Sequence, residues 1–263
     1  MASKKELELR SFGWWFKENP NNFSKWYEPV IKDCGNELKL PKSYYFTVPD
    51  VILKAMYKED GSEYSLLKRW ITEKVLSCLP EDMIGRQVFI KNATFSGKFK
   101  AECFAWCTAG DIAKAFMRIN ESAAVCDAGG YNELVIRERI HINSSLHPCI
   151  YNGLPFVPEF RVFYDFDAHK ALYCVNYWDY DYCRPALYDK TDQIIFDHEK
   201  TYMKNYFEKH KNIVMNKTSM FLKNVKMSGI WSVDIMTNPE DEEYWMIDMA
   251  RGPESAYWDE DKL

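Results

Sequence analysis

Hydrophobic residues recur at three- and four-residue intervals over the first third of the chain, a pattern typical of amphipathic helices. Three segments follow it: residues 21–34, 49–60 and 65–79. Beyond Pro80 the pattern changes, and short runs rich in Val, Ile, Phe and Tyr predict strands. These runs are residues 86–91, 129–140, 159–166 and 171–178.

Two more amphipathic segments, residues 110–125 and 197–225, predict helices among those strands, the second as one long helix or two shorter ones. Because helices and strands mix in this order, the sequence predicts an α+β fold. We expect a helix-rich N-terminal region at residues 1–85 and a main domain at residues 86–263.

The last predicted strands form a hairpin in the stretch WSVDIMTNPEDEEYWMIDMARG, from Trp231 to Gly252. A turn near residue 241 places Asp234 and Asp248 directly opposite each other on one face, which Met246 shares. Like charges opposite each other destabilise a sheet. We therefore expect a bound cation, a shared proton or a nearby Arg or Lys. The alternative is an exposed face on which both carboxylates are solvated.

Charge and cysteine content narrow the classes of function. The 263-residue chain has a net charge of −5 and a pI of about 5.7, which makes nucleic acid an unlikely partner. Among eight cysteines, Cys103 and Cys107 are spaced as two metal ligands on a helix face, or as two small buried hydrophobes. The charged first residues do not resemble a signal peptide, and no run approaches the roughly 20 apolar residues that span a bilayer. We expect a reduced, cytoplasmic protein without a membrane partner.

Basic residues near predicted strands could face the two carboxylates. Lys91 ends an apolar run, and Thr94, Ser96, Gly97 and Lys98 follow it with hydroxyls, a flexible backbone and a second cation. Such a loop can bind phosphates through backbone N–H groups and ammonium charge. Alternatively, Lys91 extends its head into solvent at the end of a strand.

Arg161 lies in the middle of the predicted strand EFRVFYDF, on the same face as Glu159. A cation among apolar residues needs a partner. The partner could be a phosphate, or an Asp or Glu in a structural ion pair.

The order of these motifs resembles the ATP-grasp superfamily over roughly residues 86–252. A strand-end lysine precedes a small-residue loop, a strand containing RE follows, and EFRVF leads to the VDI and IDM runs of the hairpin. Within the superfamily, the order and composition of the motifs most resemble the cell-division-cycle ATP-grasp family and related clades in bacteria and phages.

The resemblance implies ATP and Mg²⁺ as cofactors, and an ATP-grasp fold of two α+β subdomains that clasp the nucleotide. It also implies Lys91 and Arg161 as catalytic residues. The implied contacts are, for the phosphates, Lys91, Thr94, Ser96, Gly97, Lys98 and Arg161; for adenine, Glu138, Arg139 and Ile140; for ribose or phosphates, Glu159; and for Mg²⁺, Asp234 and Asp248.

The sequence departs from the family pattern at the end of the hairpin. Many members carry an Asn that is a further metal ligand, and this chain has Ala250 at that place. Asp248 is also shorter than the usual Glu. The number of metal ions that the resemblance implies is therefore open.

The function that the resemblance implies is an ADP-forming ligase. A small-molecule, peptide or protein carboxylate is phosphorylated to an acyl phosphate, which an amine or thiol then attacks. Two alternatives use the same ATP site: a nucleotide-dependent assembly factor that binds a protein client, and a small-molecule kinase.

A third alternative comes from Lys58–Gly61, whose letters KEDG fit the KxDG motif of covalent nucleotidyltransferases. The motif falls at the end of a predicted helix instead of after a strand, which argues against this function.

Overall fold

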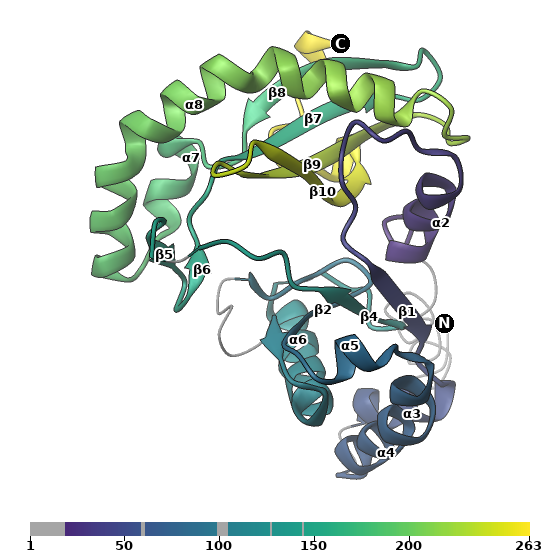
Figure 1. The fold of residues 1–263 in the computed structure, drawn as a ribbon. Helices are drawn as coiled ribbons and strands as arrows, with labels where there is room; N and C mark the ends of the chain where they lie inside the picture. The colour runs from purple at the N-terminus through teal and green to yellow at the C-terminus, as the bar shows by residue number, and fades with distance from the viewer. Residues whose placement is uncertain (1–18, 59–60, 99–104, 127, 144) are drawn as a thin grey trace, which may run out of the picture. The chain divides into compact units, whose positions relative to one another are not determined.

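The computed structural model describes residues 19–58, 61–98, 105–126, 128–143 and 145–263. Helices and strands are mixed, so the expected α+β class is confirmed (Figure 1). The chain divides into two compact units: unit 1 spans Met1–Ser24 and Lys42–Ile140, and unit 2 spans Lys25–Pro41 and His141–Leu263. This division does not coincide with the predicted boundary at residues 85/86, because the helices after residue 42 pack with the strands up to residue 140.

Unit 1 is built around a sheet with the strand order β1-β4-β2-β3. Its elements are β1 (Ser43–Thr47), α3 (Asp50–Lys58), α4 (Glu63–Trp70), the π-helical turn η1 (Ile71–Val75), η2 (Leu76–Cys78), α5 (Glu81–Ile84), β2 (Val88–Asn92), β3 (Trp106–Cys107), η4 (Ala109–Asp111), α6 (Ile112–Val125) and β4 (Glu133–Glu138).

One face of this sheet forms the core of unit 1. Alternation along β2 directs Val88 and Ile90 toward Phe116 of α6, and Leu134 and Ile136 of β4 join them. All five side chains are buried. Helices α3, α4 and α6, which three- and four-residue spacing predicted, pack against this core, whereas strand β1 was not predicted.

Unit 2 contains a sheet with the strand order β10-β9-β7-β8 and the short pair β5-β6. Its elements are α2 (Phe23–Asp33, whose first two residues belong to unit 1), β5 (Cys149–Ile150), β6 (Leu154–Pro155), β7 (Glu159–Asp165), β8 (Lys170–Asn176), α7 (Tyr180–Cys183), η5 (Arg184–Ala186), α8 (Lys190–Leu222), β9 (Ile230–Asn238), β10 (Glu243–Arg251), η6 (Gly252–Glu254) and η7 (Glu260–Lys262).

Helix α8 is a single continuous helix that covers one face of the unit 2 sheet (Figure 1). The side chain of Asp189 caps its first turn by accepting hydrogen bonds from the amides of Thr191 and Asp192. The ring of Phe160 on β7 packs against the rings of Tyr206 and Phe207 on α8. We call this covered side the α8 face, and the opposite side the Arg161 face.

Within the described residues, none of the helices combines the length and the hydrophobicity needed to span a bilayer.

Gly130 is required where the chain enters β4. Its backbone has φ +80°, and a Cβ there would lie 2.4 Å from Oγ1 and 2.9 Å from the backbone nitrogen of Thr94. The amide of Ala93 donates to the carbonyl of Gly130, so the two loops are joined through their backbones at this point. Any side chain would push these loops apart.

We predict that Gly130→Ala lowers the free energy of unfolding by about 2–3 kcal/mol, because backbone strain at positive φ and the contact with Thr94 add together. Urea denaturation measures the loss. Gly61→Ala is the matched control, since Gly61 has φ +83° and open space where its Cβ would be. A loss in Gly130→Ala no larger than that in Gly61→Ala would show that the contact with Thr94 has no effect.

Candidate functional site

The two carboxylates of the hairpin lie on the Arg161 face of unit 2, in one row across three neighbouring strands. Arg161 of β7 is the register partner of Asp234 in β9, and Asp234 is the register partner of Asp248 in β10. The predicted opposition of the two aspartates is therefore confirmed. A third member, Arg161, stands directly beside them.

A β-bulge produces this alignment. Met246 pairs with Ile235, but the next pair is Asp248 with Asp234, so Ile247 is an extra residue in β10. In a regular ladder Asp248 would lie on the same face as Met246, which is the α8 face. The prediction that Met246 shares the face of Asp248 was wrong, because the bulge reverses the alternation and Met246 is fully buried opposite Ile235.

Arg161 supplies the compensation that the sequence required. Its Nε donates to Oδ1 of Asp234 at 2.7 Å, and its Nη2 donates to Oδ2 at 2.8 Å. Asp234 is only 7% exposed, so the alternative of two solvated carboxylates is wrong for this residue. Burial opposes the charge of Arg161, but the adjacent Asp234 outweighs burial and raises the pKa of the guanidinium above its ordinary value.

Two further groups hold the guanidinium. Nη1 of Arg161 donates to the carbonyl of Ala256 at 3.3 Å, and the guanidinium lies 4.9 Å from the ring centre of Tyr177. The plane of a guanidinium favours such stacking on an aromatic ring. Asp248 is half-buried and adds negative charge that also favours the cation.

Residues of β7 on either side of Arg161 mark the two ends of the Arg161 face. Glu159 lies two positions before Arg161 in β7, on the same face of the sheet as predicted. Its side chain is buried. Two positions after Arg161, the ring of Phe163 stacks on Tyr173 with centres 4.4 Å apart and meets Trp258 at 5.7 Å. Aromatic rings therefore cover one end of the face and an acidic residue stands at the other.

Unit 1 buries two cations on the face of its sheet that points away from the core. Lys91 is 1% exposed and pairs in register with Val135, so the alternative that its head extends to solvent is wrong. Arg137, two positions after Val135, is 3% exposed. Its Nε donates to Oγ of Ser43, and its guanidinium lies 5.6 Å from the ring of Phe23. We did not assign a role to Arg137, although its place in an alternating strand was visible.

The predicted phosphate loop is anchored at its beginning. The side-chain oxygen of Asn92 accepts hydrogen bonds from the amides of Thr94 and Phe95 at 3.0 and 2.6 Å. The hydroxyl of Thr94 donates to the carbonyl of Ala128 at 2.9 Å. A phosphate contact of Thr94 stays a prediction, and it requires that these bonds break.

The rest of the predicted loop follows this anchor. Gly97 is buried and has φ +60°, a conformation that suits glycine, while Ser96 and Lys98 are half-buried. Their phosphate contacts stay predictions.

The predicted adenine-binding residues lie at and just beyond the end of β4. Oε1 of Glu138 accepts a hydrogen bond from the amide of Lys42 at 2.8 Å, and the amide of Glu138 donates to the carbonyl of Lys42. The guanidinium of Arg139 lies 4.2 Å from the ring of Trp106, and Ile140 is half-buried. Strand β4 therefore ends at Glu138, two residues earlier than the apolar pattern predicted.

The structure gives little support to the two other candidate sites, the cysteine pair and the KxDG motif. Cys107 lies in strand β3 instead of on a helix, and burial raises the pKa of its thiol to about 12, which disfavours the thiolate that binds metals. Its predicted partner Cys103 lies outside the described residues. Lys58 ends helix α3, while Glu59 and Asp60 of the same motif also lie outside them. The described part of the chain contains no group of three or more His, Cys, Asp or Glu that could hold a metal ion.

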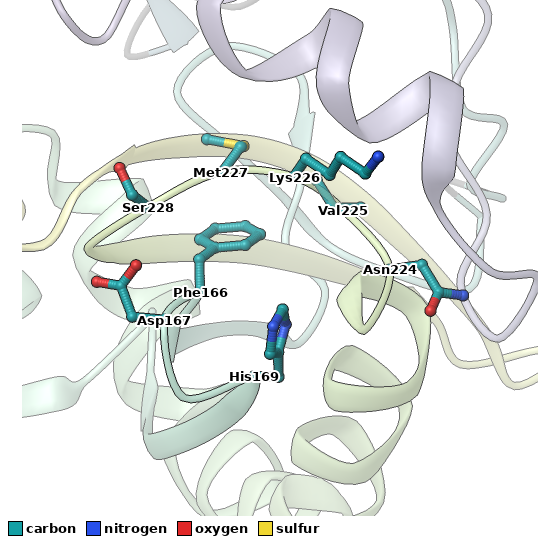
Figure 2. A pocket seen from close by; sticks show the side chains of 8 residues that line it. All are labelled: Phe166, Asp167, His169, Asn224, Val225, Lys226, Met227 and Ser228. Atoms are coloured by element: carbon teal, nitrogen blue, oxygen red, sulfur yellow. The ribbon is translucent and has the colours of Figure 1, made fainter.

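A surface pocket of about 670 Å³ lies at another end of unit 2 (Figure 2). Its lining residues come from the turn after β7 and from the connection between α8 and β9: Phe166, Asp167, His169, Asn224, Val225, Lys226, Met227 and Ser228. Arg161 lies four residues, or roughly 13 Å of extended strand, before the end of β7 at Asp165, and Phe166 begins the turn beyond it. The pocket is therefore distinct from the row of charges.

We predict that Arg161→Met lowers the free energy of unfolding by about 3 kcal/mol, because it leaves the buried carboxylate of Asp234 without its partner. Arg161→Met combined with Asp234→Leu should recover most of that loss. Arg69→Met, which breaks the exposed pair of Arg69 with Glu73, is the control and should cost less than about 1 kcal/mol. Equal losses in the two single variants, measured by urea denaturation, would contradict a structural role for the buried pair.

No family model matches the sequence, and no curated protein matches it. Among solved structures, it is similar to C-terminally truncated Cdc123 from Schizosaccharomyces pombe, with 16% identity over 90% of this chain and 86% of that one and a TM-score of 0.48. It is also similar to the VanG D-Ala:D-Ser ligase from Enterococcus faecalis (12% identity, 87% of this chain, 51% of that one, TM-score 0.39). A third similar structure is the D-alanine-D-alanine ligase from Coxiella burnetii, with 12% identity over 87% of this chain and 46% of that one and a TM-score of 0.36.

Proposed function

We propose that this chain is an ATP- and Mg²⁺-dependent protein of the ATP-grasp type that acts as an ADP-forming ligase on a carboxylate substrate. The observation that supports this function best is the row of Arg161, Asp234 and Asp248 across β7, β9 and β10. It combines a cation for phosphate oxygens with two carboxylates for a metal ion.

The two carboxylates fit Mg²⁺. This ion is commonly bound by one or two protein carboxylates, with water and substrate phosphates completing its shell. Asp234 and Asp248 are paired in register, and two like charges side by side favour a cation near them. Mg²⁺ bound there would neutralise phosphate charge. It would compete with Arg161 for the oxygens of Asp234.

Both units contain buried or mostly buried cations of the kind that stabilise phosphoryl transfer. The transferred group carries spread negative charge, so fixed cations lower the barrier more than covalent help does. In unit 2 the guanidinium of Arg161 is held in place by Asp234 and Ala256. In unit 1 Lys91 and Arg137 are buried on one face of the sheet. We assign Lys91 and Arg161 to the phosphates and add Arg137 as a further candidate.

In the proposed reaction the substrate carboxylate attacks the γ-phosphorus of ATP, and ADP leaves. The acyl phosphate that forms is then attacked by an amine or thiol, and phosphate leaves. Acyl phosphates hydrolyse in water, so a covered site is needed. We assign Ser96, Gly97 and Lys98 to the loop that closes on the phosphates, and the backbone of Arg139 and Ile140 beside Glu138 to adenine.

A second candidate function is a nucleotide-dependent assembly factor that binds ATP·Mg²⁺ and a protein client with little turnover. Two observations favour it over a ligase. Ala250 stands where many ATP-grasp proteins carry a further metal ligand, and Asp234 is engaged with Arg161 through both of its oxygens. A small-molecule kinase remains the third option with the same nucleotide site.

We predict that the wild-type protein binds ATP more tightly with Mg²⁺ than without it, as isothermal titration calorimetry would show. Lys91→Met should weaken binding about tenfold or more in both conditions, because a charged contact to phosphate is lost. Asp248→Asn should remove the difference between the two conditions, because one of the two metal ligands is lost.

Lys54→Met and Asp82→Asn are the matched controls, since both side chains are exposed on helices of unit 1. If both site variants bound Mg·ATP like the wild type, the proposed nucleotide site would be wrong.

Product analysis with ATP and candidate acceptors separates the three candidate functions. A ligase releases ADP with a new amide or thioester, a kinase forms a stable phosphoester, and an assembly factor turns over little.

A further inference from the structure

The residues after β10 fold back onto the Arg161 face of unit 2. We call Gly252–Lys262 the C-terminal segment. The ring of Trp258 meets Phe163 there, and its position requires Gly252, because a Cβ on Gly252 would lie 2.4 Å from the Trp258 ring. The amide of Asp259 donates to the hydroxyl of Tyr173 in β8 at 2.9 Å. The segment is thus fastened to the edge of the row that contains Arg161.

Tyr257 is the anchor of this segment. Its φ of +67° is an uncommon conformation for a bulky residue, which persists only where the surroundings hold it. The hydroxyl donates to the carbonyl of Tyr177 at 3.1 Å and lies 3.5 Å from Sγ of Cys183, while the ring meets Tyr182 at 4.6 Å. Burial raises the pKa of this phenol, so the hydroxyl keeps its proton and remains a donor.

The anchor determines where the preceding residues lie. The carbonyl of Ala256, next to Tyr257 in the chain, accepts the hydrogen bond from Nη1 of Arg161. Oγ of Ser255 lies 2.7 Å from Oγ of Ser232, which is two positions before Asp234 on the same face of β9. Contacts of the segment therefore reach the sheet on both sides of the guanidinium.

Tyr177 connects the anchor and the guanidinium a second time. Its carbonyl accepts the bond from Tyr257, and its ring stacks with Arg161 at 4.9 Å. The arginine is thus held by Asp234 on one side, and by Ala256 and Tyr177 on the other. If a metal ion bound Asp234, that carboxylate would be shared, and Ala256 and Tyr177 would have to keep the guanidinium in place.

We propose that Tyr257 is a positioning residue, which fixes the guanidinium of Arg161 toward a phosphate by anchoring the C-terminal segment. This inference rests on the proposed function, since it adds a holder to the phosphate-binding arginine. The role is indirect: Tyr257 acts through Ala256 and Tyr177 and does not itself bind the nucleotide.

A double-mutant cycle tests the proposal. Tyr257→Phe removes the hydroxyl and keeps the ring, and we expect it to weaken Mg·ATP binding about fivefold in calorimetry. In the background of Arg161→Met the same change should have almost no further effect, because the group that it positions is absent. Tyr188→Phe is the matched control, since Tyr188 is 97% exposed. Where the wild type binds Mg·ATP, an equal fold-change in both backgrounds, or none in either, would overturn the proposal.

A second readout does not depend on nucleotide binding. Phenylglyoxal modifies accessible arginines, and mass spectrometry of the peptide that contains Arg161 gives the rate at that residue. Tyr257→Phe should raise this rate severalfold above those of the wild type and Tyr188→Phe. If the rate rises while the wild type binds no nucleotide, the proposed function fails and the positioning role stands. If the rate is unchanged, the positioning role fails even where nucleotide binds.

Discussion

Arg161 and Asp234 lie opposite each other on the two inner strands of the unit 2 sheet, and neither charge is tolerated there alone. A buried charge requires a partner with good geometry, and the two parallel hydrogen bonds between guanidinium and carboxylate provide it. This pair allows Asp248 to stand beside Asp234, because the positive charge of Arg161 offsets one of the two negative charges. It also makes the row responsive to ligands, since a cation and a phosphate would each exchange for one member of the pair.

The residues around this row hold its charges in fixed positions, and fixed charges can bind a charged ligand. Aromatic rings of Phe163, Tyr173 and Trp258 cover one end of the Arg161 face, and the carbonyl of Ala256 in the C-terminal segment accepts a hydrogen bond from Arg161. Preorganised charges of this kind act strongly because little rearrangement is needed when a charged group arrives. In unit 1 the buried cations Lys91 and Arg137 follow the same principle on the face away from the core.

Most secondary elements were predictable from the chain alone. Periodicity located helices α2, α3, α4, α6 and α8 and strands β2, β4, β7, β8, β9 and β10, because each of these buries one face against a core. Strand β1 was missed, since Ser43–Thr47 has no clear alternation and pairs with β4, which is distant in sequence. The end of β4 was placed too late, because Ile140 continues the alternation of Leu134 and Ile136 after the strand pairing has stopped.

The sequence by itself determined which residues carry charge into the strands, because a lone Lys, Arg or Asp in an apolar run is visible at once. It also determined that Asp234 and Asp248 need compensation, since the hairpin register brings them together. Only the tertiary structure decided what compensates them. The partner Arg161 lies on another strand, and the bulge at Ile247 puts Met246 and Asp248 on opposite faces of β10. Pairings between distant segments depend on packing and register across the whole sheet, and local patterns along the chain do not encode them.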